Sequence, residues 1–345
     1  MENSFEQEYW RNRFEQLAQE SIEDTEKKSK EIIQIYEKAS NEIIIAIFAF
    51  YGRWAVENTL TYQEAIKDLQ GKEFKVWRMN IEQYVNQVNK TGDQKLLREL
   101  NGLALRSRIN RLEELETRIK MILHDGAFKE QSTCTKHLTH TYQDQYYKTI
   151  YEVQKGIGLC YNFSNIDHRK LKMVLDHPWS GENYSNRIWN NREKLAQSIK
   201  EELTQKIIQG KSNRDIANSM ASKMEVSKEN AKKIIDTESA YLSTKASLDG
   251  YHESQIEEYE NLATLDRRTS SICQKQDGKV YKLTEAVIGL NCPPFHTRCR
   301  TVTVPHLGAK TGTRIARDEN GNNILVDANM TYEEWAEKYN VKAIE

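Results

Sequence analysis

The chain contains only four prolines in 345 residues, and none occurs before Pro178. Proline breaks a helix interior, because its ring removes a backbone donor and clashes with the preceding turn. The same region is rich in glutamate, lysine, glutamine and leucine, which are good helix formers. The sequence therefore predicts long helices over residues 1–130, with breaks near residue 71, at residues 89–93 and at residues 124–126.

After residue 255 the pattern changes to short β-like runs, at residues 259–264, 280–283 and 301–304. We therefore expect a mainly α-helical fold, in which a long helical N-terminal region precedes a small α+β C-terminal domain. The predicted segments are a long-helix region (1–130), an aromatic-rich helical connector (131–190), the α+β domain (191–305), and a basic loop with a short C-terminal helix (306–345).

Residues with metal-binding chemistry gather in the α+β domain. Cys273 is followed after eighteen residues by Cys292, after three more by His296 and after two more by Cys299. Cysteine and histidine are ligands of tetrahedral zinc, so these four side chains predict a zinc site. The spacing differs from the common paired zinc motifs. The alternative is that Cys273 and Cys299 are small buried residues and His296 is a hydrogen-bonded turn residue.

Further residues accompany these ligands in a fixed order. They are Thr237 and Glu238, then Asp266, Thr269, Cys273, Asp277, Gly278, Gly289, Pro293, Pro294, His296, Cys299 and Arg300. Over about residues 195–305 this order resembles the signature of the phage Mu F-like family, the minor head or head morphogenesis proteins of tailed bacteriophages. Two positions depart from the family pattern: Asp236 stands where an arginine is usual, and Cys292 stands where a small residue is common.

The resemblance implies that residues 191–305 form a Mu F-like head morphogenesis domain, in which the shared residues other than cysteine and histidine are structural. It implies a phage or prophage minor head protein with few copies inside the capsid. Such a protein binds the portal protein and acts in head morphogenesis and in DNA packaging or ejection, without a catalytic step. Scaffolding and major capsid proteins and double-stranded DNA are further expected partners. The implied location is the virion, after synthesis in the host cytoplasm.

The overall charge excludes a protein that is basic along its whole length, since 50 basic residues stand against 51 acidic ones. Contact with DNA must then come from a local cluster. The best basic cluster consists of Arg298, Arg300, Lys310, Arg314 and Arg317. Five scattered cysteines favour a reducing cytoplasm over a disulfide framework. The longest apolar run, residues 43–51, is too short to cross a membrane.

Two other functions fit the same residues. In a zinc-dependent hydrolase or nuclease, Cys273, His296 and Cys299 would hold the metal beside a carboxylate that acts as general base. The candidate bases are Glu238, Asp266 and Asp277. Three protein ligands leave a position open for water, so the additional Cys292 argues for a structural site instead. A nonspecific DNA-binding protein would bind phosphates through the basic cluster with salt-dependent affinity.

Overall fold

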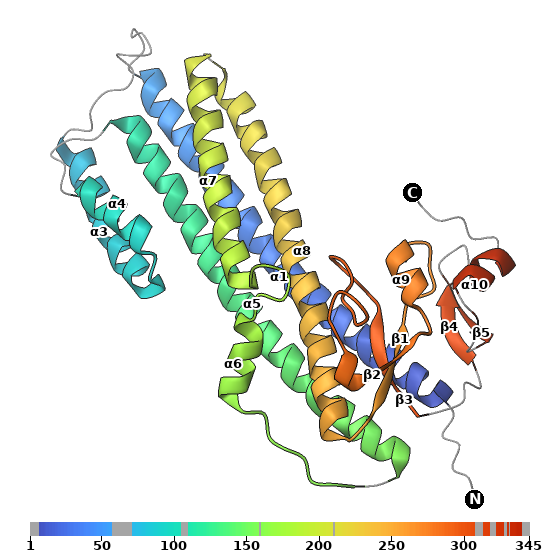
Figure 1. The fold of residues 1–345 in the computed structure, drawn as a ribbon. Coiled ribbons are helices and arrows are strands. Elements are labelled where there is room, and N and C mark those ends of the chain that lie inside the picture. Colours follow the sequence, from blue (N-terminus) through green and yellow to red (C-terminus); the bar gives the residue numbers. More distant parts are fainter. Residues whose placement is uncertain are drawn as a thin grey trace, which may run out of the picture. The chain divides into compact units, whose positions relative to one another are not determined.

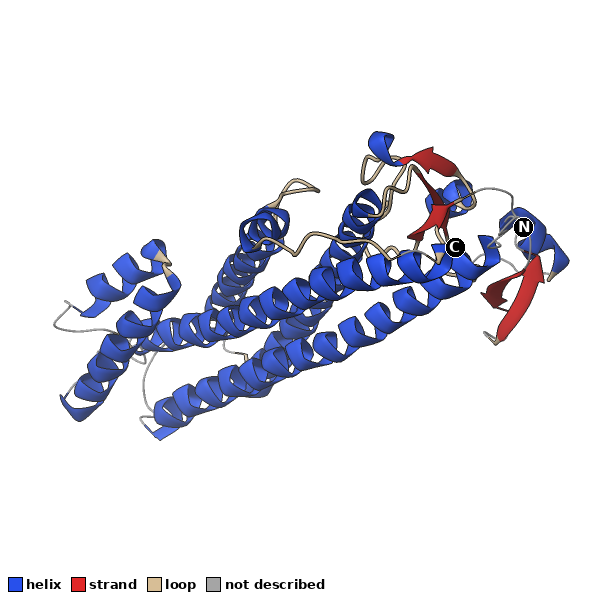
Figure 2. Cartoon of the chain, turned by 90° about the horizontal axis from the view of Figure 1, so that it is seen from below, coloured by secondary structure: helices blue, strands red, loops and turns tan. Residues whose placement is uncertain are grey.

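The computed structural model describes residues 7–56, 71–104, 110–158, 160–209, 211–307, 313–317, 322–327, 330 and 332–339. The chain is predominantly helical, with a few short strands in its C-terminal part (Figure 1, Figure 2), which confirms the predicted fold class. It forms two compact units, each assembled from separate stretches of sequence. The first unit comprises residues 1–30, 133–184 and 232–345, and the second comprises residues 31–132 and 185–231.

Long helices account for most of the described chain. They are α1 (Gln7–Val56), α3 (Gly71–Thr91), α4 (Gln94–Ala104), α5 (Arg111–Ile157), α6 (His168–Asp176), α7 (Tyr184–Ile208) and α8 (Asn213–Glu253). The predicted break at residues 89–93 separates α3 from α4, and Gly92 there adopts a φ of 77° that favours glycine. At the start of α8, the Ser212 hydroxyl accepts from the Asp215 amide at 3.2 Å and so caps the helix.

The predicted break at residues 124–126 is wrong, because α5 passes through these residues without interruption. His124 is fully buried, and its ring lies 5.1 Å from the ring of Trp189. A Cβ added at Gly126 would lie 3.9 Å from Ile35, so a neighbouring helix closely covers this position. A glycine costs a helix interior about 1 kcal/mol relative to alanine, and packing of this kind offsets that cost.

The second unit is built from helices alone within the described residues. One of its apolar clusters joins α3, α4 and α5 through Trp77, Ile81, Val88, Leu96, Leu100 and Met121. Arg192 of α7 donates to Asp93 at 2.7 Å and so ties α7 to the turn before α4. No helix in the described part of the chain is long and apolar enough to span a membrane.

The first unit contains a three-stranded antiparallel sheet with the order β2-β1-β3. These strands are β1 (Glu258–Leu262), β2 (Val280–Lys282) and β3 (Val302–His306), which correspond to the predicted β-like runs. Tyr259 of β1 lies opposite Tyr281 of β2 and Pro305 of β3. The core against this sheet comes from α1, α5 and α8, with Trp10, Phe14, Leu17, Val153, Tyr251 and Tyr259 among its members.

A buried ion pair joins the start of α1 to the central strand of this sheet. The guanidinium of Arg11 donates to the Glu260 carboxylate at 2.5 Å, and both side chains are almost completely buried. Gln7 donates to the same carboxylate at 3.3 Å and to the Pro305 carbonyl at 3.0 Å. The first turns of α1 are therefore part of the C-terminal sheet structure.

The C-terminal segment contains more structure than the predicted basic loop. Strand β4 (Thr313–Arg317) pairs antiparallel with β5 (Asn323–Asp327), and the short final helix predicted from the sequence is α10 (Tyr332–Lys338). Trp335 of α10 is fully buried in a cluster with Leu265, Ala316 and Val326. This cluster joins the hairpin and α10 to the residues that follow β1.

Candidate functional site

Three of the four predicted metal ligands meet in the first unit. Cys273 lies on the short helix α9 (Ser271–Gln276), and His296 and Cys299 lie in the loop before β3. The Cys273 Sγ lies 3.1 Å from His296 Nε2 and 3.6 Å from Cys299 Sγ. All three ligand atoms lie within 4.8 Å of one another, and both cysteines are buried while His296 is half-buried. This group has the donor set and size of a metal site.

Hydrogen bonds shift the acidity of the three side chains in different directions. The Cys273 thiol and then the His296 ring lower the pKa of the Cys299 thiol well below its usual range, with help from the backbone amides of Phe295 and Thr301, and they outweigh burial. The hydrogen bond with Cys299, followed by burial, raises the pKa of Cys273. The hydrogen bond with Cys299 also raises the pKa of His296. Cys299 is therefore the side chain that most readily becomes a thiolate here.

The fourth predicted ligand, Cys292, does not belong to this group. Its side chain is fully buried in the core between the helices and the sheet, together with Tyr251 and Tyr259. Burial raises the pKa of its thiol to about 12, so it behaves as a small apolar side chain. The predicted arrangement with four ligands is therefore not the one that the structure forms.

The shared motif residues fasten loops to helix α8 and to one another. Thr237 of α8 accepts from the Arg298 backbone amide at 3.1 Å and donates to the Lys233 carbonyl at 2.6 Å. Glu238 accepts from the Trp179 indole at 2.9 Å, and the ring of Trp179 stacks on Tyr241 with 4.8 Å between centroids. Both positions on α8 therefore hold segments that are distant in sequence.

The Asp266 carboxylate forms a second set of hydrogen bonds and ion pairs. Arg300 donates to both of its carboxylate oxygens, at 2.5 and 2.7 Å, and Arg317 and Arg268 lie 3.7 and 4.0 Å from it. The Thr269 hydroxyl donates to it at 3.2 Å. Burial alone would raise the pKa of Asp266, but the hydrogen bonds and charge of Arg300 lower it below the usual value.

The remaining motif residues shape the turns around α9. Asp277 accepts from the Ala263 amide at 2.9 Å, and Gly278 donates to the Asn261 carbonyl at 2.8 Å. Gly278 and Gly289 have φ values of 69° and 88°, a region in which glycine is favoured because it lacks Cβ. Pro293 and Pro294 are joined by a cis peptide bond.

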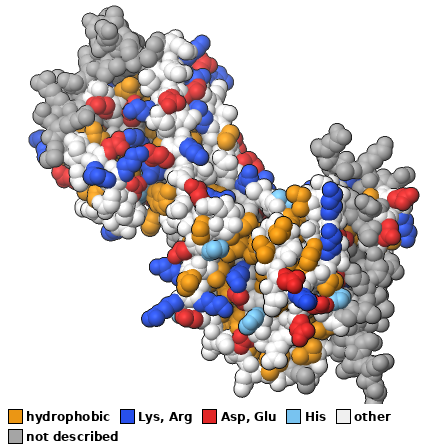
Figure 3. Space-filling view, viewed as in Figure 1, with side chains coloured by type: hydrophobic (Ala, Val, Ile, Leu, Met, Phe, Trp, Pro, Cys, Tyr) orange, Lys and Arg blue, Asp and Glu red, His pale blue; other side chains and the backbone are white. Residues whose placement is uncertain are grey.

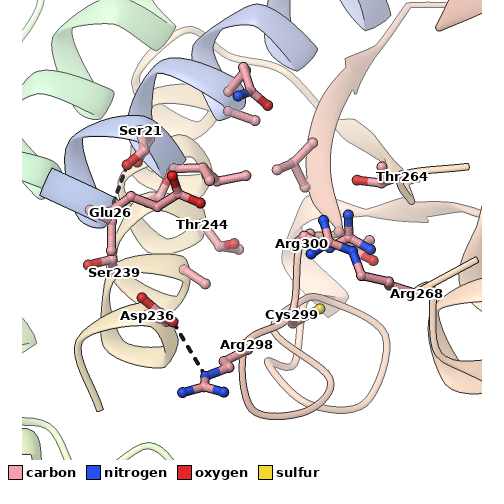
Figure 4. A pocket seen from close by; sticks show the side chains of 18 of the residues that line it. Ser21, Glu26, Asp236, Ser239, Thr244, Thr264, Arg268, Arg298, Cys299 and Arg300 are labelled. Atoms are coloured by element: carbon pink, nitrogen blue, oxygen red, sulfur yellow. Dashed lines mark hydrogen bonds and ion pairs between the residues drawn. The ribbon is translucent and has the colours of Figure 1, made fainter. Parts of the chain in front are cut away.

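A pocket of about 490 Å³ lies beside the metal-ligand group (Figure 4). Residues of α1 and α8 form one wall, and Thr264 with residues 298–302 forms the other. Arg298 points across the pocket to Asp236 of α8, with 3.4 Å between their charged atoms. Arg300 and Arg268 lie on the wall opposite α8. The cations lining the pocket are Lys232, Arg268, Arg298, Arg300 and Arg317, and the acids are Glu26 and Asp236.

The pocket contains three of the five predicted DNA-binding residues, namely Arg298, Arg300 and Arg317. Lys310 and the side chain of Arg314 lie outside the described residues. Lys232 and Arg268 were not predicted, because neither belongs to the basic run after residue 296. Arg268 lies only two positions after the motif residue Asp266. On the visible face of the molecule, basic and acidic side chains are interleaved (Figure 3).

The part of the chain that contains this site matches a known protein family. Residues 197–304 match the family model described as Phage Mu protein F like protein. This segment is similar to the Mu F-like family. It contains the metal-ligand group and all the motif residues described above, and it coincides with the segment over which the sequence resembles that family. The matched segment makes up about a third of the chain.

One curated relative shares a longer stretch with the chain. It is the NAD(+)--arginine ADP-ribosyltransferase EFV of Enterococcus faecalis (strain ATCC 700802 / V583), which is 23% identical over 220 residues. The match covers 59% of this chain and 45% of the relative, so the chain spans less than half the length of that protein. No solved structure matches the chain.

Proposed function

We propose that the chain is a minor head protein that is present in few copies inside the capsid, binds the portal protein and acts in DNA packaging or ejection. The Mu F-like match over residues 197–304 supports the general role, and the chemistry of the motif supports a role without catalysis. In this proposal, scaffolding and major capsid proteins are further partners during head assembly.

The main support for the proposal is that the polar residues of the Mu F-like motif hold loops and strands in place through hydrogen bonds. Thr237 holds the backbone of Arg298, and Asp266 holds the side chain of Arg300. Glu238 and Asp277 accept hydrogen bonds from an indole and a backbone amide. A motif used in this way maintains a shape, and a fixed shape is what docking to another protein requires.

The same contacts disfavour the rival zinc-dependent hydrolase or nuclease. A general base needs an accessible carboxylate whose pKa is near the working pH. The pKa of Asp266 is lowered, and Arg300 donates hydrogen bonds to both of its carboxylate oxygens. Glu238 is only 4% exposed and accepts a hydrogen bond from the Trp179 indole. Asp277 accepts from a backbone amide. All three candidate bases therefore have structural partners.

The direct test is deletion of the gene from the phage or prophage genome that encodes it, with complementation from a plasmid. We expect the protein in purified particles at far fewer copies than the major capsid protein, measured by quantitative mass spectrometry. We expect particles without it to lose infectivity, with heads that electron microscopy shows to be misassembled or poorly filled with DNA. Purified particles that lack the protein, together with an unchanged titre after deletion, would contradict the proposal.

The portal contact needs its own measurement. The portal protein encoded by the same genome should be retained by the tagged full chain, and Asp266→Asn, which weakens the fastening of the motif, should reduce that retention. The exposed variant Ser222→Ala on α8 serves as a control that should bind as wild type does. Equal lack of binding by wild type and both variants would remove the portal from the proposal.

DNA binding is a second candidate function, supported by the cations of the pocket. Five cations and two acids line it, and Asp266 adds one more acid, so the surrounding charge is positive. Such a site attracts phosphate and gives affinity that falls steeply with salt. Binding of a short DNA duplex at two salt concentrations tests this candidate, and an affinity independent of salt would contradict it.

A further inference from the structure

We propose that Cys273, His296 and Cys299 bind one zinc ion and leave its fourth coordination position open. The proposal is independent of any role in the virion, because it rests on the positions of three ligand atoms. In a tetrahedral site with Zn–S of about 2.3 Å and Zn–N of about 2.0 Å, ligand atoms lie roughly 3.5–3.8 Å apart. The observed separations of 3.1 and 3.6 Å, with all atoms within 4.8 Å, are close to this geometry.

The orientation of the His296 ring supports metal binding. Its Nδ1 lies 2.8 Å from the Thr297 carbonyl oxygen, which can only accept, so Nδ1 carries the proton. Nε2 then presents its lone pair to the two sulfur atoms. Histidine ligands of zinc are commonly held in this way, with the other ring nitrogen donating to a carbonyl or carboxylate.

The charge of the site also fits zinc. Cys273 and Cys299 are 2% and 5% exposed, and two thiolates buried so close together would repel each other strongly. A divalent cation cancels both charges, so that the buried site becomes neutral. The Ser270 hydroxyl accepts from the Cys273 amide at 3.3 Å as the cap of α9, which fixes the position of one ligand before the metal arrives.

The geometry distinguishes zinc from a disulfide. The two sulfur atoms lie 3.6 Å apart, whereas a disulfide bond requires about 2.0 Å. Cys292 lies in the separate core cluster with Tyr259. Among the described residues, no other histidine, cysteine, aspartate or glutamate joins the group of three. Three protein ligands therefore hold the metal, and its fourth coordination position stays open.

The metal would connect α9 to the loop that carries the pocket arginines. Arg298 and Arg300 flank Cys299 directly, and both line the pocket. Loss of the metal would therefore loosen the turn that presents these arginines, as well as the packing of Ala263 and Phe295 around the cysteines. Chelation should lower the melting temperature of the full chain for this reason.

The experiment measures zinc in the full chain, purified in a reducing buffer without chelator, by elemental analysis. The ligand variants are Cys273→Ser, His296→Ala and Cys299→Ser, and the controls are Cys292→Ala in the core and Cys160→Ser on the surface. We expect one zinc per chain in wild type and both controls, and loss of the metal in each ligand variant. Chelator should lower the melting temperature of wild type and of Cys160→Ser alike.

Replacement of zinc by cobalt tests ligand type without any substitution, so a ligand variant that fails to fold does not remove the test. Thiolate-to-cobalt charge-transfer absorption and intense visible bands of four-coordinate cobalt are expected in wild type. Folded wild type that binds neither metal would overturn the proposal, as would zinc that survives in the ligand variants. A Cys273–Cys299 disulfide found by mass spectrometry in the same reducing buffer would overturn it as well.

Discussion

The backbone amide of Arg298 donates a hydrogen bond to the hydroxyl of Thr237, 3.1 Å away, although 61 positions separate the two residues. Arg298 adopts a φ of 57°, in the left-handed region that residues other than glycine rarely occupy. Its side chain then reaches Asp236, next to Thr237 on α8. Asp236 thus pairs with an arginine of the loop.

Thr237→Val should destabilise the first unit, because the amide of Arg298 loses its acceptor. This hydrogen bond is partly buried, and the loss of a typical hydrogen bond costs about 0.5–1.5 kcal/mol. Urea denaturation should show this decrease in the free energy of unfolding, with Ser222→Ala on the exposed face of α8 as the control. A loss below about 0.5 kcal/mol, the usual scatter of surface substitutions, would show that the contact is dispensable.

Asp266→Asn should reduce stability in a way that depends on pH. The pKa of Asp266 is lowered in the folded chain, so its pairing with Arg300 contributes fully above the unfolded pKa of about 4 and is lost as the pH falls through the folded pKa. We expect a loss of roughly 2–4 kcal/mol at pH 7, somewhat below that for fully buried pairs because Arg300 is partly exposed. The difference from wild type should shrink as the pH approaches 3.

The control for this pH dependence is Asp144→Asn, which removes an exposed pair with Lys148 on α5. Exposed pairs of this kind are worth about 0–1 kcal/mol, so this variant should differ little from wild type at any pH. Denaturant unfolding at several pH values gives both comparisons. A difference for Asp266→Asn that is constant over the whole range would show that its charge does not stabilise the fold.

Gly156→Ala should destabilise the chain, because a Cβ at this position would overlap the ring of Trp10. Trp10 is fully buried, so the ring has little freedom to move aside, and overpacking typically costs about 1–3 kcal/mol. Gly102→Ala is the matched test within a helix, since nothing lies within 4 Å of its added Cβ. It should stabilise the chain by about 0.4–1 kcal/mol. Thermal unfolding that ranks the two in the opposite order would contradict the packing of α1 on α5.

Arg268→Ala/Arg317→Ala should weaken DNA binding while leaving the Arg300–Asp266 pair in place. For every phosphate that the variant no longer neutralises, the slope of log affinity against log salt should become shallower by about 0.9. The control Lys172→Ala/Lys211→Ala removes the same charge from exposed residues that do not line the pocket. Fluorescence anisotropy with a short duplex makes the measurement. Equal effects of the two double variants would mean that the pocket has no special part in binding.

The elements that sequence predicts well are those that local residue preferences determine. The absence of proline, the turn around Gly92 and the β-like runs near Tyr259, Val280 and Val302 correspond to elements of the structure. The error at residues 124–126 has the opposite cause. Burial of His124 against Trp189 depends on a helix some 60 positions away in sequence, and no local pattern reports such packing.

The candidate site was predictable to a similar degree. Chemical type identified Cys273, His296 and Cys299, but spacing alone could not show that the peptide around Cys292 turns its side chain into the core. The contact of Trp179 with Glu238 and the pocket position of Lys232 also depend on tertiary packing. No local sequence pattern predicts the Trp179–Glu238 contact or the pocket position of Lys232.

The pairing of Arg11 with Glu260 sets the order in which the protein can fold during synthesis. The two residues are 249 positions apart, and at about 5–20 residues per second a ribosome needs on the order of 10–50 s to make the segment between them. Until then Trp10, Phe14 and Leu17 have no sheet to cover them. The nascent chain must keep this apolar stripe from aggregating, and only a chain translated beyond the central strand can bury these three side chains against the sheet.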